Sequence, residues 1–193
     1  MSISESVWAR TDGGRREDRF AGIGPLFAEL ADRHRPEELL FLCIGTDRSS
    51  GDAFGPLVGT RLRAAGFPHV VGTLEEPCDA TNLGTIAASL PPELTVVAVD
   101  ACLGKPGSVG TFLALRGPLV PAASMKGSFA PVGAYSIAAV VNMNGPKPYQ
   151  TLQTSSLRLV LDMADRAAAA AEAAFGLGPG DVVRRSEDVH ERS

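Results

Sequence analysis

Residues 39–56 read LLFLCIGTDRSSGDAFGP and contain an apolar run, a polar glycine-rich loop and the start of a helix. The run Leu39–Ile44 shows no polar alternation, which is typical of a parallel strand buried on both faces. The loop follows directly. Pro56 suits the first position of the next helix, and we expect this helix to end at Gly66. A strand, a loop and a helix in this order predict an α/β protein.

The rest of the chain continues this alternation. Further strands are predicted at His69–Leu74, Leu94–Val99 and Val109–Leu115. Helices are predicted at Leu26–Leu30, at Leu83–Leu90 and at Val132–Val141, and the second of these has a cap at Asp79 or Thr81. The last helix begins at Thr151 or Thr154 and continues through Ala174. Such alternation implies right-handed crossovers and a mostly parallel sheet covered on both faces. We therefore expect a single α/β domain over residues 21–176, a flexible arm at residues 1–20 and a disordered tail at residues 177–193.

The composition is that of a globular protein and excludes several partners. The 193 residues fit one domain, and 45% hydrophobic with 21% charged residues allows a sizeable core. A net charge of −4 argues against nucleic acid, which would require a basic patch. No apolar run reaches membrane-spanning length, and Met1–Phe20 has no apolar signal core. We expect a cytoplasmic protein with neither a nucleic-acid nor a membrane partner, and oligomer formation stays open.

The three cysteines, Cys43, Cys78 and Cys102, include no C-x-x-C pair. Neither a disulfide framework nor a zinc motif is indicated. Cys43 and Cys102 lie in or beside apolar strands, so we expect them to be buried thiols without a chemical role.

Two acids follow predicted strands, at the sheet edge where open α/β proteins place their ligands. Asp52 lies in the glycine-rich loop, where it either caps the next helix or acts as a functional carboxylate whose pKa the helix N-terminus lowers. Asp100 follows the apolar run Val96–Val99 and is costly to bury without a partner, which favours a functional role. If the two acids face each other, one protonated and one ionised carboxyl would act on one water as general acid and general base.

Five further residues are candidates for substrate contacts. Asp47, Arg48 and Ser49 belong to the same loop as Asp52, while Glu75 and Asp79 belong to a second acidic loop after a strand. Other catalytic patterns are missing, because the chain has no Walker A motif, no G-x-G-x-x-G motif and no G-x-S-x-G elbow.

Several short segments, in their order and spacing, resemble the YyaC-type sporulation proteins of spore-forming bacteria. They are CIGTDRSSGD (43–52) with GPLVG (55–59), GTLEEP (72–77) with Asn82-Leu83, VDACLG (99–104), PVG (131–133) with Ser136-Ile137, and Val141-Asn142. Proteins of this type are similar to the germination (spore) protease and, more distantly, to the hydrogenase maturation endopeptidases. The resemblance covers residues 39–164.

This resemblance implies a three-layer α/β/α fold of the phosphorylase/hydrolase-like type. Two aspartates are the proposed catalytic residues of the germination protease, and by motif position they match Asp52 and Asp100. The resemblance thus implies a sporulation-associated endopeptidase that cleaves a protein or peptide, such as a small spore protein, in the mother cell or forespore. In the hydrogenase maturation enzymes the same two positions bind nickel together with a histidine. The histidine that follows Asp100 here is His190 in the tail, so we expect no cofactor, while a divalent metal at Asp52 and Asp100 stays open.

Departures from the family pattern keep other functions open. The YyaC pattern commonly has a histidine where this chain has Cys78-Asp79, and an aspartate where it has Ala134. A chain altered in this way would be a non-catalytic module that binds a spore protein without cutting it. A metal-dependent maturation-type endopeptidase and a small-molecule hydrolase or phosphorylase are the remaining alternatives.

Overall fold

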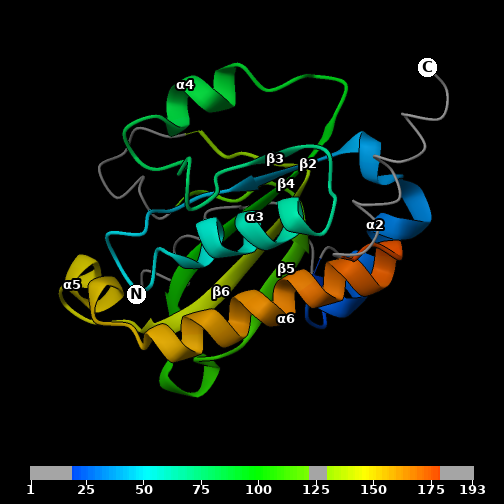
Figure 1. Cartoon of the computed structure of the whole chain (residues 1–193). Coiled ribbons are helices and arrows are strands. Elements are labelled where there is room, and N and C mark those ends of the chain that lie inside the picture. Colours follow the sequence, from blue (N-terminus) through cyan, green and yellow to red (C-terminus); the bar gives the residue numbers. More distant parts are fainter. Residues whose placement is uncertain (1–18, 122–129, 179–193) are drawn as a thin grey trace, which may run out of the picture.

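A six-stranded sheet in the order β1-β5-β6-β4-β2-β3 forms the centre of the computed structural model, which describes residues 19–121 and 130–178 (Figure 1). The strands are β1 (Arg19–Phe20), β2 (Leu39–Cys43), β3 (Val70–Val71), β4 (Thr95–Gly104), β5 (Phe112–Arg116) and β6 (Tyr135–Met143). β3, β2, β4 and β6 are parallel to one another, whereas β5 is antiparallel to β6 and to β1. The predicted mostly parallel sheet is confirmed.

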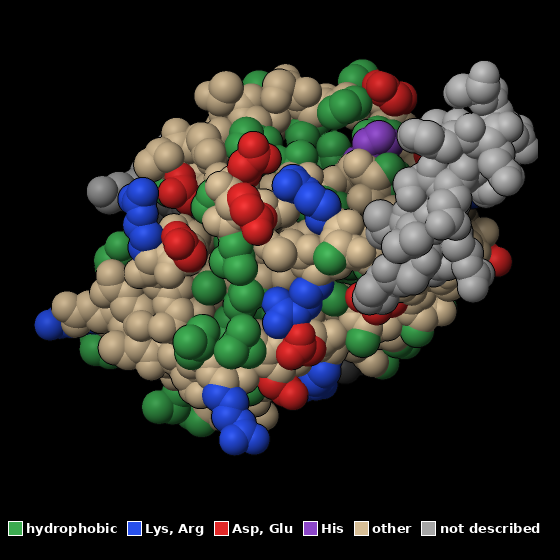
Figure 2. All heavy atoms as spheres, viewed as in Figure 1, with side chains coloured by type: hydrophobic (Ala, Val, Ile, Leu, Met, Phe, Trp, Pro, Cys, Tyr) green, Lys and Arg blue, Asp and Glu red, His purple; other side chains and the backbone are tan. Residues whose placement is uncertain are grey.

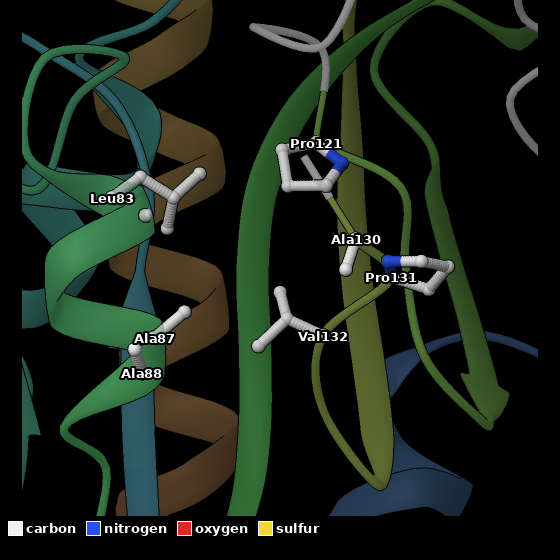
Figure 3. Close-up of a pocket in the computed structure, with 8 residues that line it drawn as sticks. Leu83, Ala87, Ala88, Pro121, Ala130, Pro131 and Val132 are labelled. Carbon is white, nitrogen blue, oxygen red and sulfur yellow. The ribbon is translucent and has the colours of Figure 1, made fainter. Parts of the chain in front are cut away.

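Helices lie on both faces of this sheet. One face carries α2 (Ile23–Arg33), α3 (Phe54–Ala64) and α6 (Leu157–Phe175), and α6 packs against both of the others. The other face carries α4 (Leu83–Ala88), and Figure 3 shows α4 and α6 on opposite sides of the strands. The remaining helices are α5 (Pro148–Gln153) and the 3-10 turns η2 (Pro36–Glu38) and η3 (Pro106–Ser108). The result is the predicted three-layer α/β/α arrangement.

Side chains of the central strands alternate between the two faces. In β2, Phe41 and Cys43 belong to the large core under α2, α3 and α6, whereas Leu42 belongs to the smaller core under α4. β4 follows the same alternation, so Val99 faces α3 and Asp100 faces away from it, on the side of α4. This alternation determines which layer can reach Asp100.

The segment predicted as a helix over Val132–Val141 is wrong, because residues 135–143 form strand β6. The segment inserts between β4 and β5 and is buried from Tyr135 to Val141. Its β-branched residues Ile137, Val140 and Val141 suit a strand that is paired on both sides.

The predicted end of the third strand at Val99 is also wrong, because β4 continues to Gly104. Its parallel register with β6 runs from Val97↔Tyr135 past Asp100↔Ala138, with an irregularity only after Cys102. Asp100 therefore lies within a strand, not after it. The second strand is shorter than predicted, because β3 ends at Val71. The next residue, Gly72, has φ +89°, which is not a strand conformation, and a Cβ there would overlap the Cys43 carbonyl oxygen.

Helix starts differ from the predictions at three places. Pro56 is the third residue of α3, not the first, and remains within the first turn, which tolerates proline. Thr151 lies in the separate helix α5, and Ser156 caps α6 by accepting a hydrogen bond from the Leu159 N–H. α4 starts after Asn82, whereas the Asp79 carboxyl bonds to Thr81 and caps no helix.

The proposed terminal segments lie mostly outside the described residues, namely 1–18 of the arm and 179–193 of the tail. Within the arm, Arg19 and Phe20 pair with Leu115 and Ala114, so the sheet begins before residue 21. Leu177, at the other boundary, packs against the large core. No helix in the described part of the chain has the length and apolarity needed to cross a membrane.

Candidate functional site

Three segments converge on Gly45 and Thr46, immediately after β2. The Ile44 N–H donates to the Val99 carbonyl of β4 at 2.7 Å, and the Gly45 N–H donates to the Cys78 carbonyl at 2.8 Å. The Thr46 N–H donates to the carbonyl of Asp52 at 3.2 Å, where the loop returns. Because Asp100 directly follows Val99, the backbones of Asp52 and Asp100 are brought to the same corner of the sheet.

Glycines allow the loop to pack this tightly. A Cβ on Gly45, which has φ +144°, would overlap the carbonyl oxygen of Asp52. On the other side, the Gly51 N–H donates to the Leu152 carbonyl of α5 at 2.9 Å, and a Cβ there would lie 2.8 Å from the same oxygen. The loop is therefore clamped between β2 and α5, which fixes the residues it carries.

Asp52 is a half-buried side chain that does not cap α3. The N-cap of α3 is Ala53, with no side-chain cap hydrogen bond, so the capping alternative is wrong. Burial raises the pKa of Asp52, and the nearby Ser49 hydroxyl, a donor to the ionised carboxyl, partly opposes that rise. The pKa of Asp52 is thus shifted in the direction opposite to the lowering expected from the helix N-terminus.

Asp100 is only 6% exposed, in the interior of β4. Its Oδ1 accepts a hydrogen bond from the adjacent Ala101 N–H at 2.8 Å. Asp100 also lies near Cys78. Burial raises the pKa of the Cys78 thiol to about 12, and the negative charges of Asp79 and Asp100 add to this rise. Asp100 is therefore a buried acid beside a neutral thiol.

Cys78 was not among the predicted site residues, yet it lies beside Asp100 and is fully buried. A cysteine immediately before Asp79, in a loop that follows a strand, was the available signal. Burial and the neighbouring Cys78 likewise raise the pKa of Cys43, which faces α3. All three cysteines are buried and free, as expected for Cys43 and Cys102.

The five predicted substrate-contact residues divide into two groups. In the clamped loop, Ser49 is buried, whereas Asp47 and Arg48 are exposed. In the second loop, the pKa of Asp79 is lowered mainly by hydrogen bonds from Thr81, and the nearby positive charge of Arg48 adds to this lowering. Glu75 is exposed near Arg63 of α3, where its pKa is lowered mainly by its own backbone and Thr73. Figure 2 shows acidic side chains close together above the N-terminal part of α3, with basic side chains beside them.

An apolar hollow of about 410 Å³ opens on the same sheet face as Asp100. Leu83 and Ala87 of α4 face Val132 and Pro121 across it (Figure 3). Leu83 also packs in one buried cluster with Ala98, which lies two residues before Asp100 on the same side of β4. Sequence reasoning missed this hollow because it predicted a helix starting at Val132.

The donor set does not fit a nickel site of the hydrogenase maturation type. No group of three His, Cys, Asp or Glu side chains suited to a metal occurs within residues 19–121 and 130–178. The site supplies Asp52 and Asp100 without a neighbouring histidine. We therefore derive no step through a metal.

Comparisons with known proteins agree with this fold. The family model described as "Protein of unknown function (DUF1256)" matches residues 23–170. A curated relative from Bacillus subtilis (strain 168), "Uncharacterized protein YyaC", is 42% identical over 132 residues, which is 66% of this chain and 64% of the relative. The chain thus spans slightly less than two thirds of that relative's length.

Among solved structures, the [NiFe] hydrogenase maturation protease HycI from Thermococcus kodakarensis KOD1 is similar, with a TM-score of 0.53. The match covers 78% of this chain and 99% of HycI at 21% sequence identity. At this identity the likeness shows a shared protease-like α/β fold.

Proposed function

The chain belongs to the family of proteins of unknown function named DUF1256, and we propose that it is an endopeptidase whose acid pair is Asp52 and Asp100. The observation that carries this proposal is the convergence of the two acids. Asp52 lies half-buried in the glycine-clamped loop, and Asp100 lies buried in β4, whose Val99 pairs with Ile44 at the start of that loop. The protease-like fold shared with HycI supports the same reaction class.

The environments of the two acids suggest different roles. Burial favours the protonated form of Asp52, so this carboxyl donates a hydrogen bond, and then its proton, to the oxygen of the scissile carbonyl. Asp100, which accepts the Ala101 N–H, takes a proton from the attacking water. A tetrahedral intermediate with two hydroxyl groups results. It collapses when the leaving amine receives the proton held by Asp100 and one hydroxyl of the intermediate returns a proton to Asp52, which restores both acids.

The hollow between α4 and residues 130–132 supplies a place for an apolar side chain of the substrate. It lies on the sheet face of Asp100, and its lining is alanine, leucine, valine, proline and glycine. Such a lining selects apolar groups over charged ones. A protein or peptide substrate, such as a small spore protein in the mother cell or forespore, is the proposed target.

Substitution of either acid tests the proposal. Purified chain is incubated with an extract of soluble spore proteins, and new peptide N-termini are quantified by mass spectrometry. Asp52→Asn and Asp100→Asn should each reduce cleavage by at least about 100-fold, because general acid–base groups contribute that much. Asp32→Asn, which changes an exposed aspartate of α2 outside the loop, is the matched control and should retain activity. Equal cleavage by all three variants would exclude the acid pair.

A non-catalytic binding module is the second candidate. Asp79 and Ala134 depart from the pattern that the sequence resembles, and Asp79 is already engaged by Thr81 and Arg48. This function predicts a stable complex with an uncleaved partner from the same extract. Filling the hollow by Ala87→Trp should weaken that complex, whereas Asp52→Asn should leave it intact.

A further inference from the structure

The Ser49 side chain is a buried polar group that lies near Asp52 but forms no hydrogen bond of normal geometry within residues 19–121 and 130–178. It is only 4% exposed. Buried hydroxyls are nearly always satisfied, so an exception in a native protein requires an explanation such as a catalytic role or a bound water. Its position next to an acid suggests the former.

The backbone around Ser49 directs its side chain towards Asp52. The Ala53 N–H donates to the Ser49 carbonyl at 3.0 Å, so residues 49–53 form one turn with helical spacing. Side chains three positions apart in such a turn lie on the same face, which places Ser49 and Asp52 together. The clamp at Gly51 and Leu152 holds this turn in place.

We propose that Ser49 is a positioning residue for Asp52: its hydroxyl rotates onto the Asp52 carboxylate and donates a hydrogen bond when Asp52 has released its proton. This assignment of a step rests on the proposed function, in which Asp52 is the acid. The hydroxyl is left unpaired while Asp52 is protonated and becomes paired when the negative charge develops. Such a contact stabilises the state in which the proton has been transferred more than the state before it.

Few charged groups compete for this role. The shift in the pKa of Asp52 arises from burial, opposed by the Ser49 hydroxyl. The elements around the loop carry further titratable groups: Asp47, Arg48, Cys78, Asp79, Asp100, Arg61 and Arg63 of α3, Tyr149 of α5, and Arg158, Asp162, Asp165, Arg166 and Glu172 of α6. None of them is among the causes of the shift in the pKa of Asp52, whereas the Ser49 hydroxyl is.

Carbon-13 NMR of aspartate carboxyl groups tests the inference in the full chain. The Asp52 signal is assigned as the one missing in Asp52→Asn, and its pKa is measured in variants of Ser49. Ser49→Ala and Ser49→Cys remove the strong donor and should raise the pKa of Asp52 by about one unit. Ser49→Thr keeps the hydroxyl and should restore the wild-type titration. Ser50→Ala, the adjacent half-buried serine, is the matched control and should leave the pKa unchanged.

The rate profile provides the second readout. Cleavage requires protonated Asp52, so activity falls as pH rises through its pKa, and Ser49→Ala should move this limb to higher pH by the same amount as the NMR titration. If Ser49→Ala only damaged the fold of the loop, the cleavage rate would fall at every pH, and the pH at which activity declines would stay the same. Identical Asp52 titrations in Ser49→Ala and Ser50→Ala would overturn the inference even if the chain is a peptidase. A shift in the NMR titration without any cleavage would instead reject the proposed function and retain the contact.

Discussion

Glu29 and Asp52 are both partly buried acids, and they lie at opposite ends of the parallel strands. Glu29 of α2 meets Arg116 at the end of β5 and Tyr135 at the start of β6. Asp52 lies beyond the other end, in the loop that follows β2. The same type of side chain therefore has two different environments in one fold.

Every part of the Glu29 carboxylate is engaged. Arg116 Nη2 donates to both of its oxygens, at 2.7 Å and 2.6 Å, and the Tyr135 hydroxyl donates to Oε1 at 3.1 Å. Arg33 adds an ion pair at 3.4 Å. The hydrogen bond from Arg116, aided by Tyr135 and the two cationic charges, outweighs burial and lowers the pKa of Glu29. This cluster ties α2 to the sheet.

Within residues 19–121 and 130–178, no cation contributes to the pKa of Asp52, which burial raises. An acid whose ionised form the fold stabilises contributes to the fold, whereas an acid whose ionised form is destabilised by burial is a candidate for function. The contrast separates a structural carboxylate from a candidate catalytic one. Three substitutions would break or sharpen it.

Gly45→Ala should have the largest effect. A Cβ at φ +144° would be strained and would overlap the Asp52 carbonyl oxygen, so we expect the free energy of unfolding to fall by about 3 kcal/mol. Urea denaturation measures this loss. Gly24→Ala is the control, because Gly24 lies in α2 with open space around its Cβ position and should be neutral or slightly stabilising. Equal stability of the two variants would show that the loop is not clamped as described.

The clamp also shows where sequence reasoning succeeds and fails. The apolar run at residues 39–44 and the glycines after it predicted β2 and its loop. A strand buried on both faces requires a run of apolar residues, and a tight loop requires glycine where the backbone has a positive φ, so both are visible in the sequence. The helix predicted at Val132–Val141 is wrong, because a short apolar segment does not by itself distinguish a buried helix from a strand that pairs with distant segments on both sides. Asp52 and Asp100 were identifiable as acids after apolar segments, whereas the unpaired Ser49 hydroxyl and the partner of Glu29 depend on contacts distant in sequence.

Glu29→Gln should have the next largest effect. The substitution removes the charge that pairs with Arg116 and Arg33, and we expect a loss of about 1 kcal/mol near neutral pH, since water partly replaces the pairing of these exposed arginines. Because the folded pKa is lowered, the wild-type advantage is present above the ordinary glutamate pKa and is lost as pH falls through the folded value. Urea denaturation of both proteins across pH measures this difference. Glu93→Gln, an exposed acid, should change nothing, and an equal loss there would remove the special role of the cluster.

Asp52→Asn should have the smallest effect on stability, and one of opposite sign. Burial raises the folded pKa of Asp52, so its favourable contribution is complete below the ordinary aspartate pKa and is lost as pH rises through the folded value. A neutral asparagine avoids that loss, and the variant should equal or exceed the wild type by less than about 1 kcal/mol near neutral pH. The gain should disappear on acidification, when Asp52 itself is protonated. Thermal unfolding of both proteins across pH measures the difference. A variant less stable than the wild type at neutral pH would mean that a paired Asp52 carboxylate stabilises this loop. Asp52 would then be a structural acid like Glu29, and the main physical reason for placing chemistry at this end of the sheet would be lost.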